Sequence, residues 1–173
     1  LVHPGLEQES PMGVSGNYAV MDQLFALEWV QNNIAEFGGD PNKVTIFGES
    51  GGGVNVGNLL TTAQASGLFH RAIIQSATPV INQYDTAKVE GINFVNDFIS
   101  SGSDSSKIAY MRNVHADSIS MKNNNPLAGG VVLMAWQPVI DNFIFYDSPV
   151  NVFHSGNFKK VPLIIGSNAD EMK

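Results

Sequence analysis

Residues 43–53 read KVTIFGESGGG and decide the fold, because they join a strand-like run directly to a cluster of glycines. The run 43–48 is short, β-branched and apolar, which is typical of a buried strand. Downstream, apolar residues recur at the spacing of one helix face: Val56, Leu59, Leu60 and Ala63. We therefore predict a buried strand that turns sharply into a helix.

The turn carries a G-x-S-x-G motif, Gly48-Glu49-Ser50-Gly51-Gly52. Between a strand and a helix, this motif is typical of a nucleophile elbow, in which strained backbone projects a serine hydroxyl from the end of a sheet. Side chains at Gly48 and Gly52 are expected to collide where strand and helix cross. The Gly51 N–H would face an oxyanion at the helix N-terminus. The alternative is a glycine-rich turn with an incidental serine; a phosphate loop is disfavoured because Val54-Asn55 replace its Lys and Ser/Thr.

The flanking sequence predicts an α/β fold with a mostly parallel sheet and helices on both faces. A helix is expected from Val20 to Ile34, ended by Gly38-Gly39, and residues 1–17 are expected to be irregular. Trp29 and Trp136 are expected in the core rather than as substrate platforms. Further buried strands are predicted at 71–75 and 161–166, and further helices at 89–98 and 108–114.

Composition excludes several classes of function. The 173 residues carry a net charge of −7, which argues against a nucleic-acid partner. There is no cysteine, so disulfides, thiolate zinc sites and a cysteine nucleophile are excluded. The longest apolar run, 131–136, is too short to span a membrane. Only 14% of residues are charged, against about 25% in an average domain, so some faces are expected to lie against other polypeptide.

The motif also lies within a wider resemblance. The matching blocks are Gly16-Asn17-Tyr18, Asp22-Gln23, 26–34 (ALEWVQNNI), 37–41 (FGGDP), 44–50 (VTIFGES), 67–76 (GLFHRAIIQS), 138–141 (PVID) and 162–171 (PLIIGSNADE). In this order they resemble the type-B carboxylesterase/lipase family, the carboxylesterase/cholinesterase-like α/β-hydrolases. The resemblance implies the α/β-hydrolase fold and a carboxylic ester hydrolase that acts through a serine acyl-enzyme, with a small-molecule ester as substrate and no cofactor or metal.

The resemblance also implies roles for individual residues. Ser50 would be the nucleophile, Gly51 an oxyanion donor and Glu171 the triad acid, with Asp170 as the local competitor for that last role. Without the family, Glu171 would be taken for a solvated acidic turn. The remaining candidates are Glu49, at the site floor or as a buried hydrogen-bonded acid; Ser76, as a second-shell residue near the triad or an ordinary loop hydroxyl; and Val132 and Met134, as an acyl pocket.

The general base is the missing part of this site. In α/β-hydrolases the triad order is Ser, then Asp/Glu, then His, and no histidine follows Glu171. We assign none of His3, His70, His115 and His154 as the base. The other oxyanion donors would precede residue 1. The chain also opens with Leu1 and stops directly after a strand-like segment.

We therefore expect residues 1–173 to be a central fragment of one α/β-hydrolase domain, truncated at both ends and inactive alone. It would hold an elbow at 44–65, a helical region at 86–125 and an acid-bearing strand end at 161–171, and its partners would include the missing parts of its own parent chain. The alternative function is a non-catalytic adhesion or binding member of the same fold. Localisation is left open: the absence of cysteine favours a cytoplasmic parent, and secretion is compatible with a missing N-terminus.

Overall fold

The computed structural model describes residues 1–123 and 136–171 and divides the chain into two compact units. The first unit comprises residues 1–16 and 82–139, and the second comprises residues 17–81 and 140–173. The predicted elbow and the predicted acid-bearing strand end both belong to the second unit. That all 173 residues belong to a single domain stays a prediction.

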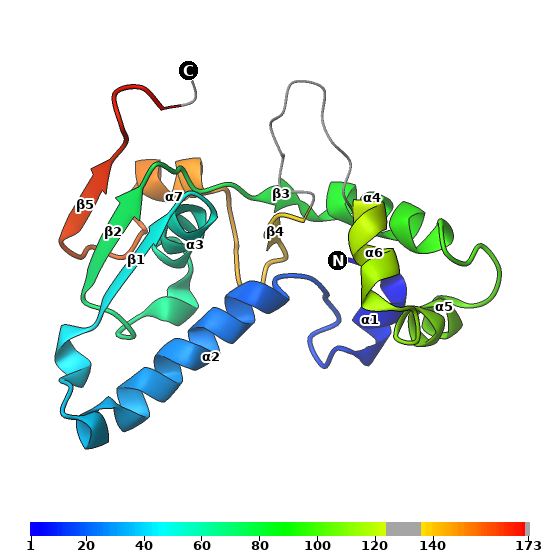
Figure 1. Cartoon of the computed structure of the whole chain (residues 1–173), viewed down its shortest axis with the longest axis horizontal. Helices are drawn as coiled ribbons and strands as arrows, with labels where there is room; N and C mark the ends of the chain where they lie inside the picture. Colours follow the sequence, from blue (N-terminus) through cyan, green and yellow to red (C-terminus); the bar gives the residue numbers. More distant parts are fainter. Residues whose placement is uncertain (124–135, 172–173) are drawn as a thin grey trace. The chain divides into compact units, whose positions relative to one another are not determined.

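The second unit is built on a parallel sheet of three strands in the order β1–β2–β5 (Figure 1). The strands are β1 (Thr45–Glu49), β2 (Arg71–Gln75) and β5 (Leu163–Gly166), close to the three predicted runs. Their register aligns Phe47 with Ile73 and Ile73 with Ile164. Because all three strands run the same way, the loops that follow them meet at one end of the sheet, where the carboxyl ends of the strands lie.

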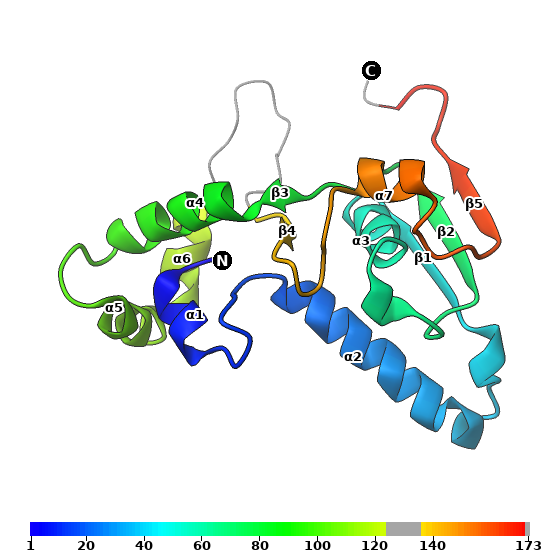
Figure 2. The same cartoon turned by 180° about the vertical axis from the view of Figure 1, so that it is seen from behind.

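Helices before and after β1 complete this unit (Figure 2). The predicted first helix is α2 (Tyr18–Asn33), which tightens into the 3₁₀ turn η1 (Ile34–Phe37) and ends at Gly38, whose φ of 79° is left-handed. The other helical elements are η2 (Pro41–Lys43), α3 (Gly51–Leu59), η3 (Ala63–Ala65) and α7 (Pro149–Ser155).

The core of this unit lies on one face of the sheet. Side chains from α2, α3, β2, the segment 60–69 and the 143–145 loop form one buried cluster: Val20, Leu24, Val56, Leu59, Leu60, Ala65, Phe69, Ala72, Ile74, Ile144 and Phe145. On the other face, Phe47 is 73% exposed and Ile164 is 66% exposed. The prediction that β1 and β5 are buried strands is therefore wrong within the described chain. Both are edge strands here, and their second face has no layer packed on it among the described residues.

The outer surface of α2 is apolar as well. Tyr18, Met21, Phe25 and Trp29 are exposed and follow a helical spacing along one side of the helix. Trp29 is 48% exposed, so its predicted place in the core is wrong. A helix with apolar residues on most of its circumference is typical of a buried position.

A buried carboxylate ties α2 to the loop after β4 (Val139–Ile140). Asp141 Oδ1 accepts backbone N–H bonds from Phe143, Ile144 and Phe145 at 2.8–3.0 Å. Its Oδ2 accepts from Asn17 Nδ2 at 2.8 Å, and Asn17 is the residue before α2. The carboxylate thus satisfies four donors, which offsets the cost of its burial.

The first unit is mainly helical. Its helices are α1 (Pro4–Glu9), α4 (Tyr84–Asn96), α5 (Asp104–Met111) and α6 (Ala116–Asn123), so the predicted helical region is present as far as it is described. The short strand β3 (Asn82–Gln83) pairs with β4, and Asn82 N donates to Pro138 O at 2.7 Å. Trp136 packs edge-on against Phe94, with ring centroids 5.1 Å apart.

The expectation of an irregular N-terminal segment is wrong for residues 4–9. His3 Nδ1 accepts from Gly5 N at 3.0 Å and caps α1, while Pro4 occupies the first turn, where its missing N–H costs nothing.

Candidate active site

Ser50 stands alone between β1, which ends at Glu49, and α3, which begins at Gly51. Its φ of 52° and ψ of −118° lie in a region that L-residues rarely occupy and that costs of order 1–3 kcal/mol. The strand ladder holds it there, because Ser50 N donates to Gln75 O at 3.0 Å. On the other side, Val54 N donates to Ser50 O at 2.9 Å and starts the helix. The predicted strand-to-helix turn with strained backbone is confirmed.

The glycines around Ser50 have different reasons to be there. A Cβ on Gly48 would lie 2.3 Å from Gly52 C and 2.4 Å from Gly52 O, so strand and helix cross too closely for a side chain. A Cβ on Gly53 would lie 2.7 Å from Ala77 Cβ. A Cβ on Gly52, in contrast, would meet nothing within 4 Å. The predicted collision is therefore confirmed at Gly48. It is wrong at Gly52, whose backbone atoms lie at the crossing with β1 while its Cβ position is open.

The Ser50 side chain is open to solvent and makes no capping bond to α3. The first intrahelical bond is the one from Val54, so the N–H groups of residues 51–53 lack intrahelical acceptors. These donors and the positive end of the helix dipole lie directly after the serine, and both favour negative charge at that position. The Gly51 N–H is the nearest of them along the chain.

Glu171 follows β5 and is held by two donors. Ser76 Oγ donates to Glu171 Oε2 at 2.7 Å, and Asn168 N donates to the same oxygen at 2.8 Å. These bonds stabilise the ionised form and lower the pKa of Glu171, the Ser76 hydroxyl having the larger effect. Ser76 thus contacts Glu171, and its place beside a catalytic triad stays a prediction.

Ser76 occupies the same place on β2 as Ser50 does on β1. Each is the first residue after its strand, and each has a positive φ, 53° for Ser76 and 52° for Ser50. Ser76 N donates to Gly166 O at 2.8 Å, which links the end of β2 to the end of β5. The hydroxyls at 50 and 76 and the carboxylate at 171 thus all follow the carboxyl ends of neighbouring parallel strands.

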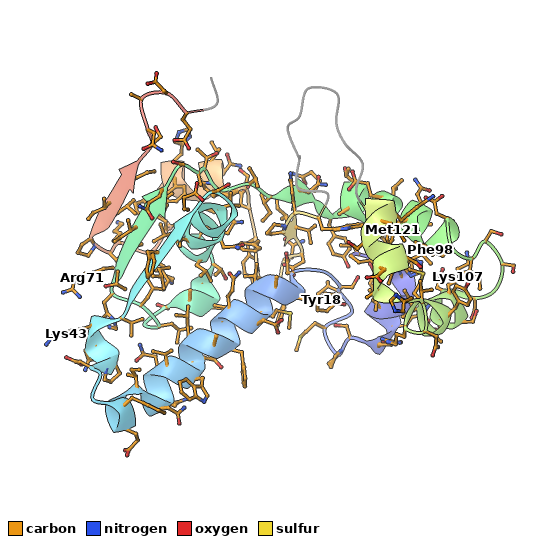
Figure 3. The ribbon with its side chains drawn as sticks, viewed as in Figure 1. Tyr18, Lys43, Arg71, Phe98, Lys107 and Met121 are labelled. Atoms are coloured by element: carbon orange, nitrogen blue, oxygen red, sulfur yellow. The ribbon has the colours of Figure 1, made fainter. Side chains whose placement is uncertain are left out.

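At the opposite end of the sheet, where the amino ends of the strands lie, the side chains are basic. Lys43 precedes β1 and Arg71 begins β2, and both side chains project at the amino-terminal edge (Figure 3). His70 also lies at that edge, one residue before β2. His154 is exposed near the end of α7, His115 is exposed and pairs with Asp117, and His3 is buried in the first unit. Over residues 1–123 and 136–171, no hydrogen bond joins a histidine to Ser50 or Glu171.

The remaining candidates from the sequence are Glu49, Val132 and Met134. Glu49 is exposed at the end of β1, so its interpretation as a buried hydrogen-bonded acid is wrong. Val132 and Met134 lie outside the described residues. Within the described ranges no three His, Asp or Glu side chains are grouped as metal ligands, and no helix there has the length and apolarity to cross a bilayer.

Sequence analysis missed the hydrogen bond from the backbone N–H of Asn168 to the Glu171 carboxylate. The Asn168 N–H has no side-chain signature, although the three-residue spacing from Asn168 to Glu171 is compatible with a turn that folds back on its own backbone. It also missed the link from Ser50 N to Gln75 O, which depends on the pairing of two strands distant in sequence.

Comparison with known proteins identifies the family. Residues 7–173 match the model described as "Carboxylesterase family". The chain belongs to the carboxylesterase family. Its fold is the α/β-hydrolase fold of that family, because a solved thermophilic PNB esterase superposes with a TM-score of 0.79 at 30% identity, over 93% of this chain and 33% of that one.

Curated carboxylesterase relatives are similar over nearly the whole chain. Fumonisin B1 esterase of Sphingopyxis macrogoltabida is 39% identical over 178 residues, which cover 99% of this chain and 31% of that protein. Human Carboxylesterase 5A is 36% identical over 159 residues, which cover 90% of this chain and 27% of that protein. The chain thus spans about a third or less of the length of these relatives.

Proposed function

We propose that the protein containing this chain is a carboxylic ester hydrolase that acts through an acyl-enzyme on Ser50. One observation carries the proposal: Ser50 has strained backbone between β1 and α3, with its hydroxyl unbonded to the helix and exposed. An incidental serine in a glycine-rich turn would have no need of this conformation, which costs free energy. Membership of the carboxylesterase family supports the same reaction class.

In the proposed reaction, Ser50 Oγ attacks the ester carbonyl carbon while a histidine takes the hydroxyl proton. The carbonyl oxygen becomes an oxyanion, which the Gly51 N–H stabilises at the tip of α3. The tetrahedral intermediate collapses, the alcohol leaves with the proton from the histidine, and the acyl group stays on Ser50. Water then attacks the acyl group on Ser50 with the same histidine as base, which releases the carboxylic acid and restores the serine hydroxyl.

Glu171 is proposed as the acid that orients this histidine and stabilises its imidazolium form. Its low pKa suits that role, because the carboxylate must stay ionised while its partner gains a proton. Ser76 and the Asn168 N–H are positioning groups, since they hold the Glu171 carboxylate through one of its oxygens and leave Oε1 for the imidazole. The histidine itself is proposed to lie outside residues 1–173.

The test is an esterase assay on the polypeptide made from the complete reading frame, with a short-chain activated ester as substrate. Ser50→Ala should lower kcat/KM by at least ~10³-fold, and Glu171→Gln by ~10²–10⁴-fold. The matched control is Ser155→Ala, which removes an exposed hydroxyl on α7 and should leave the rate unchanged. Residues 1–173 alone should show no turnover above background. Full activity in Ser50→Ala, or in the isolated chain, contradicts the proposal.

A further inference from the structure

Two glycines on one face of α3 lie against the segment that follows β2. Gly53 and Gly57 are four residues apart, so they share one side of the helix. A Cβ on Gly53 would lie 2.7 Å from the Cβ of Ala77, and a Cβ on Gly57 would lie 2.9 Å from the Cβ of Pro79. Ordinary contact begins near 3.4 Å. Ala77 and Pro79 therefore pack directly against the backbone of α3.

A buried amide holds the far end of the same segment. Asn58 follows Gly57 in α3 and is fully buried, and its Nδ2 donates to Val80 O at 3.1 Å. Glycine in the interior of a helix is destabilising relative to alanine. The close approach of Pro79 is a physical reason for glycine at position 57. Residues 77–80 are thus fixed on α3 by two packing contacts and one hydrogen bond.

This fixed segment begins directly after Ser76, the residue that contacts the predicted acid. Ser76 has a φ of 53°, a conformation that persists only where the surrounding structure imposes it. On its other side, Gln75 O accepts a hydrogen bond from Ser50 N at 3.0 Å. The backbone is therefore held both before and after Ser76, and its hydroxyl reaches Glu171 Oε2 at 2.7 Å.

We propose that the contacts of residues 77–79 with α3 position Ser76 and, through its hydroxyl, the Glu171 carboxylate. Ala77 and Pro79 are then positioning residues for the triad acid, and the inference rests on the proposed function of Glu171. One helix serves both parts of the site, because its first turn follows the nucleophile and its glycines fix the segment that holds the acid. The competing interpretation is that these contacts only stabilise the fold.

The first test is a double-mutant cycle in the polypeptide made from the complete reading frame. Gly57→Ala places a methyl group against Pro79, seven residues beyond Ser50. It should lower kcat for a short-chain activated ester by ~10-fold or more and leave KM nearly unchanged, because the Ser76 hydroxyl is displaced. In the Ser76→Ala background the same change should alter kcat by less than ~2-fold, since no hydroxyl remains to be displaced. The fall in Tm should be similar in both backgrounds.

Pro79→Ala probes the same contact without adding a clash. It removes the two ring carbons, Cδ and Cγ, that lie 3.0 and 3.2 Å from the Cβ position of Gly57. If Gly57→Ala does not fold, Pro79→Ala takes its place in the cycle with the same expected pattern. Thr78→Ala is the matched control, because Thr78 lies between the two positioning residues and its side chain is exposed. It should leave kcat and KM unchanged.

The second test moves a methyl group from one side of the contact to the other. In Gly53→Ala, the new Cβ would lie 2.7 Å from the Cβ of Ala77, so kcat should fall by ~10-fold or more. In Gly53→Ala/Ala77→Gly, the nearest atoms to the new Cβ are Gln75 O at 3.0 Å and Gly48 O at 3.1 Å. A small shift accommodates the methyl group there, so kcat should return to within ~3-fold of the parent value.

Three outcomes overturn the proposal. The first is a change at position 57 or 79 that leaves kcat unchanged when Ser76 is present. The second is a loss of kcat by the same factor with and without the Ser76 hydroxyl, which assigns the contacts to fold stability alone. The third is Gly53→Ala/Ala77→Gly with kcat as low as Gly53→Ala. Full activity in Ser50→Ala contradicts the proposed function, whereas these outcomes in an enzyme that depends on Ser50 contradict only the positioning role.

Discussion

Alanine substitutions at Gly48 and Gly52 distinguish the effect of the close crossing of β1 and α3 from the effect of ordinary helix propensity. In Gly48→Ala, the new Cβ would lie 2.3 Å from Gly52 C, whereas ordinary contact begins near 3.4 Å. The backbone on one side would have to move by about 1 Å. Overpacking typically costs 1–3 kcal/mol, and we expect about 3 kcal/mol because backbone atoms are on both sides of the clash. For a chain of this size that is a fall in Tm of about 6–12 °C.

Gly52→Ala is the matched control, because Gly52 is the last residue of the motif and the second residue of α3. Its Cβ would meet nothing within 4 Å, and its φ is not positive. Because alanine restricts the unfolded chain and favours helix, the change should be neutral or stabilise residues 1–173 by up to ~1 kcal/mol. Urea denaturation followed by circular dichroism measures both variants. If Gly48→Ala is as stable as the parent chain, or if Gly52→Ala costs as much as Gly48→Ala, the close crossing is not the reason for the motif.

Three further changes test other contacts. Ser76→Ala removes the main donor to Glu171, so the Glu171 pKa should rise toward its ordinary value of 4.5, and carboxyl NMR titration showing no rise would contradict the contact. Asp141→Ala leaves three backbone donors without their acceptor and should cost more than ~3 kcal/mol in chemical denaturation, while Asp147→Ala, an exposed carboxylate, should cost less than ~1 kcal/mol. Burial lowers the pKa of His3 below its ordinary value of 6.5, so the contribution of neutral His3 to stability should be full above pH 6.5 and fall as the pH drops toward the folded pKa. His3→Asn keeps an acceptor that can cap α1 and should remove that part of the pH dependence of the Tm. A pH profile of the Tm that is the same in His3→Asn as in the parent chain would refute the assignment.

The local elements of the second unit could be predicted because their signals are contained in short windows. The spacing of apolar residues gave α2 and α3, and Gly38 supplied the left-handed stop that the sequence required. The position of Ser50 between β1 and α3 followed from the glycines on either side of it. These features depend on backbone conformation and nearest neighbours, so distant parts of the chain do not alter them.

The burial of the strands could not be predicted in the same way. A run such as 161–166 indicates a strand that is covered when the whole sheet is present, but exposure depends on what packs against each face. In the described chain, β5 has a neighbour on one side only, and the Phe47 side chain faces an uncovered surface. The same reason explains why Trp29 is exposed.

Side-chain to backbone contacts were missed for a different reason. The role of Asp141 depends on the N–H groups of the loop that follows it, and Asp-Asn after a strand gives only a general turn signal. The start of α1 was encoded by His3 and Pro4, an N-cap acceptor and a proline in the first turn. The same residues, His3-Pro4-Gly5, are also typical of a turn, so the sequence is compatible with an irregular segment as well as with a capped helix.

Covalent trapping of the nucleophile is the most direct test of the central claim that Ser50 is the reactive serine. The polypeptide from the complete reading frame is treated with a fluorophosphonate probe, digested, and sequenced by mass spectrometry. A single adduct on Ser50 is expected, and it should be lost together with esterase activity in Ser50→Ala. An adduct on a different serine, or ester hydrolysis that survives full modification of Ser50, would contradict it.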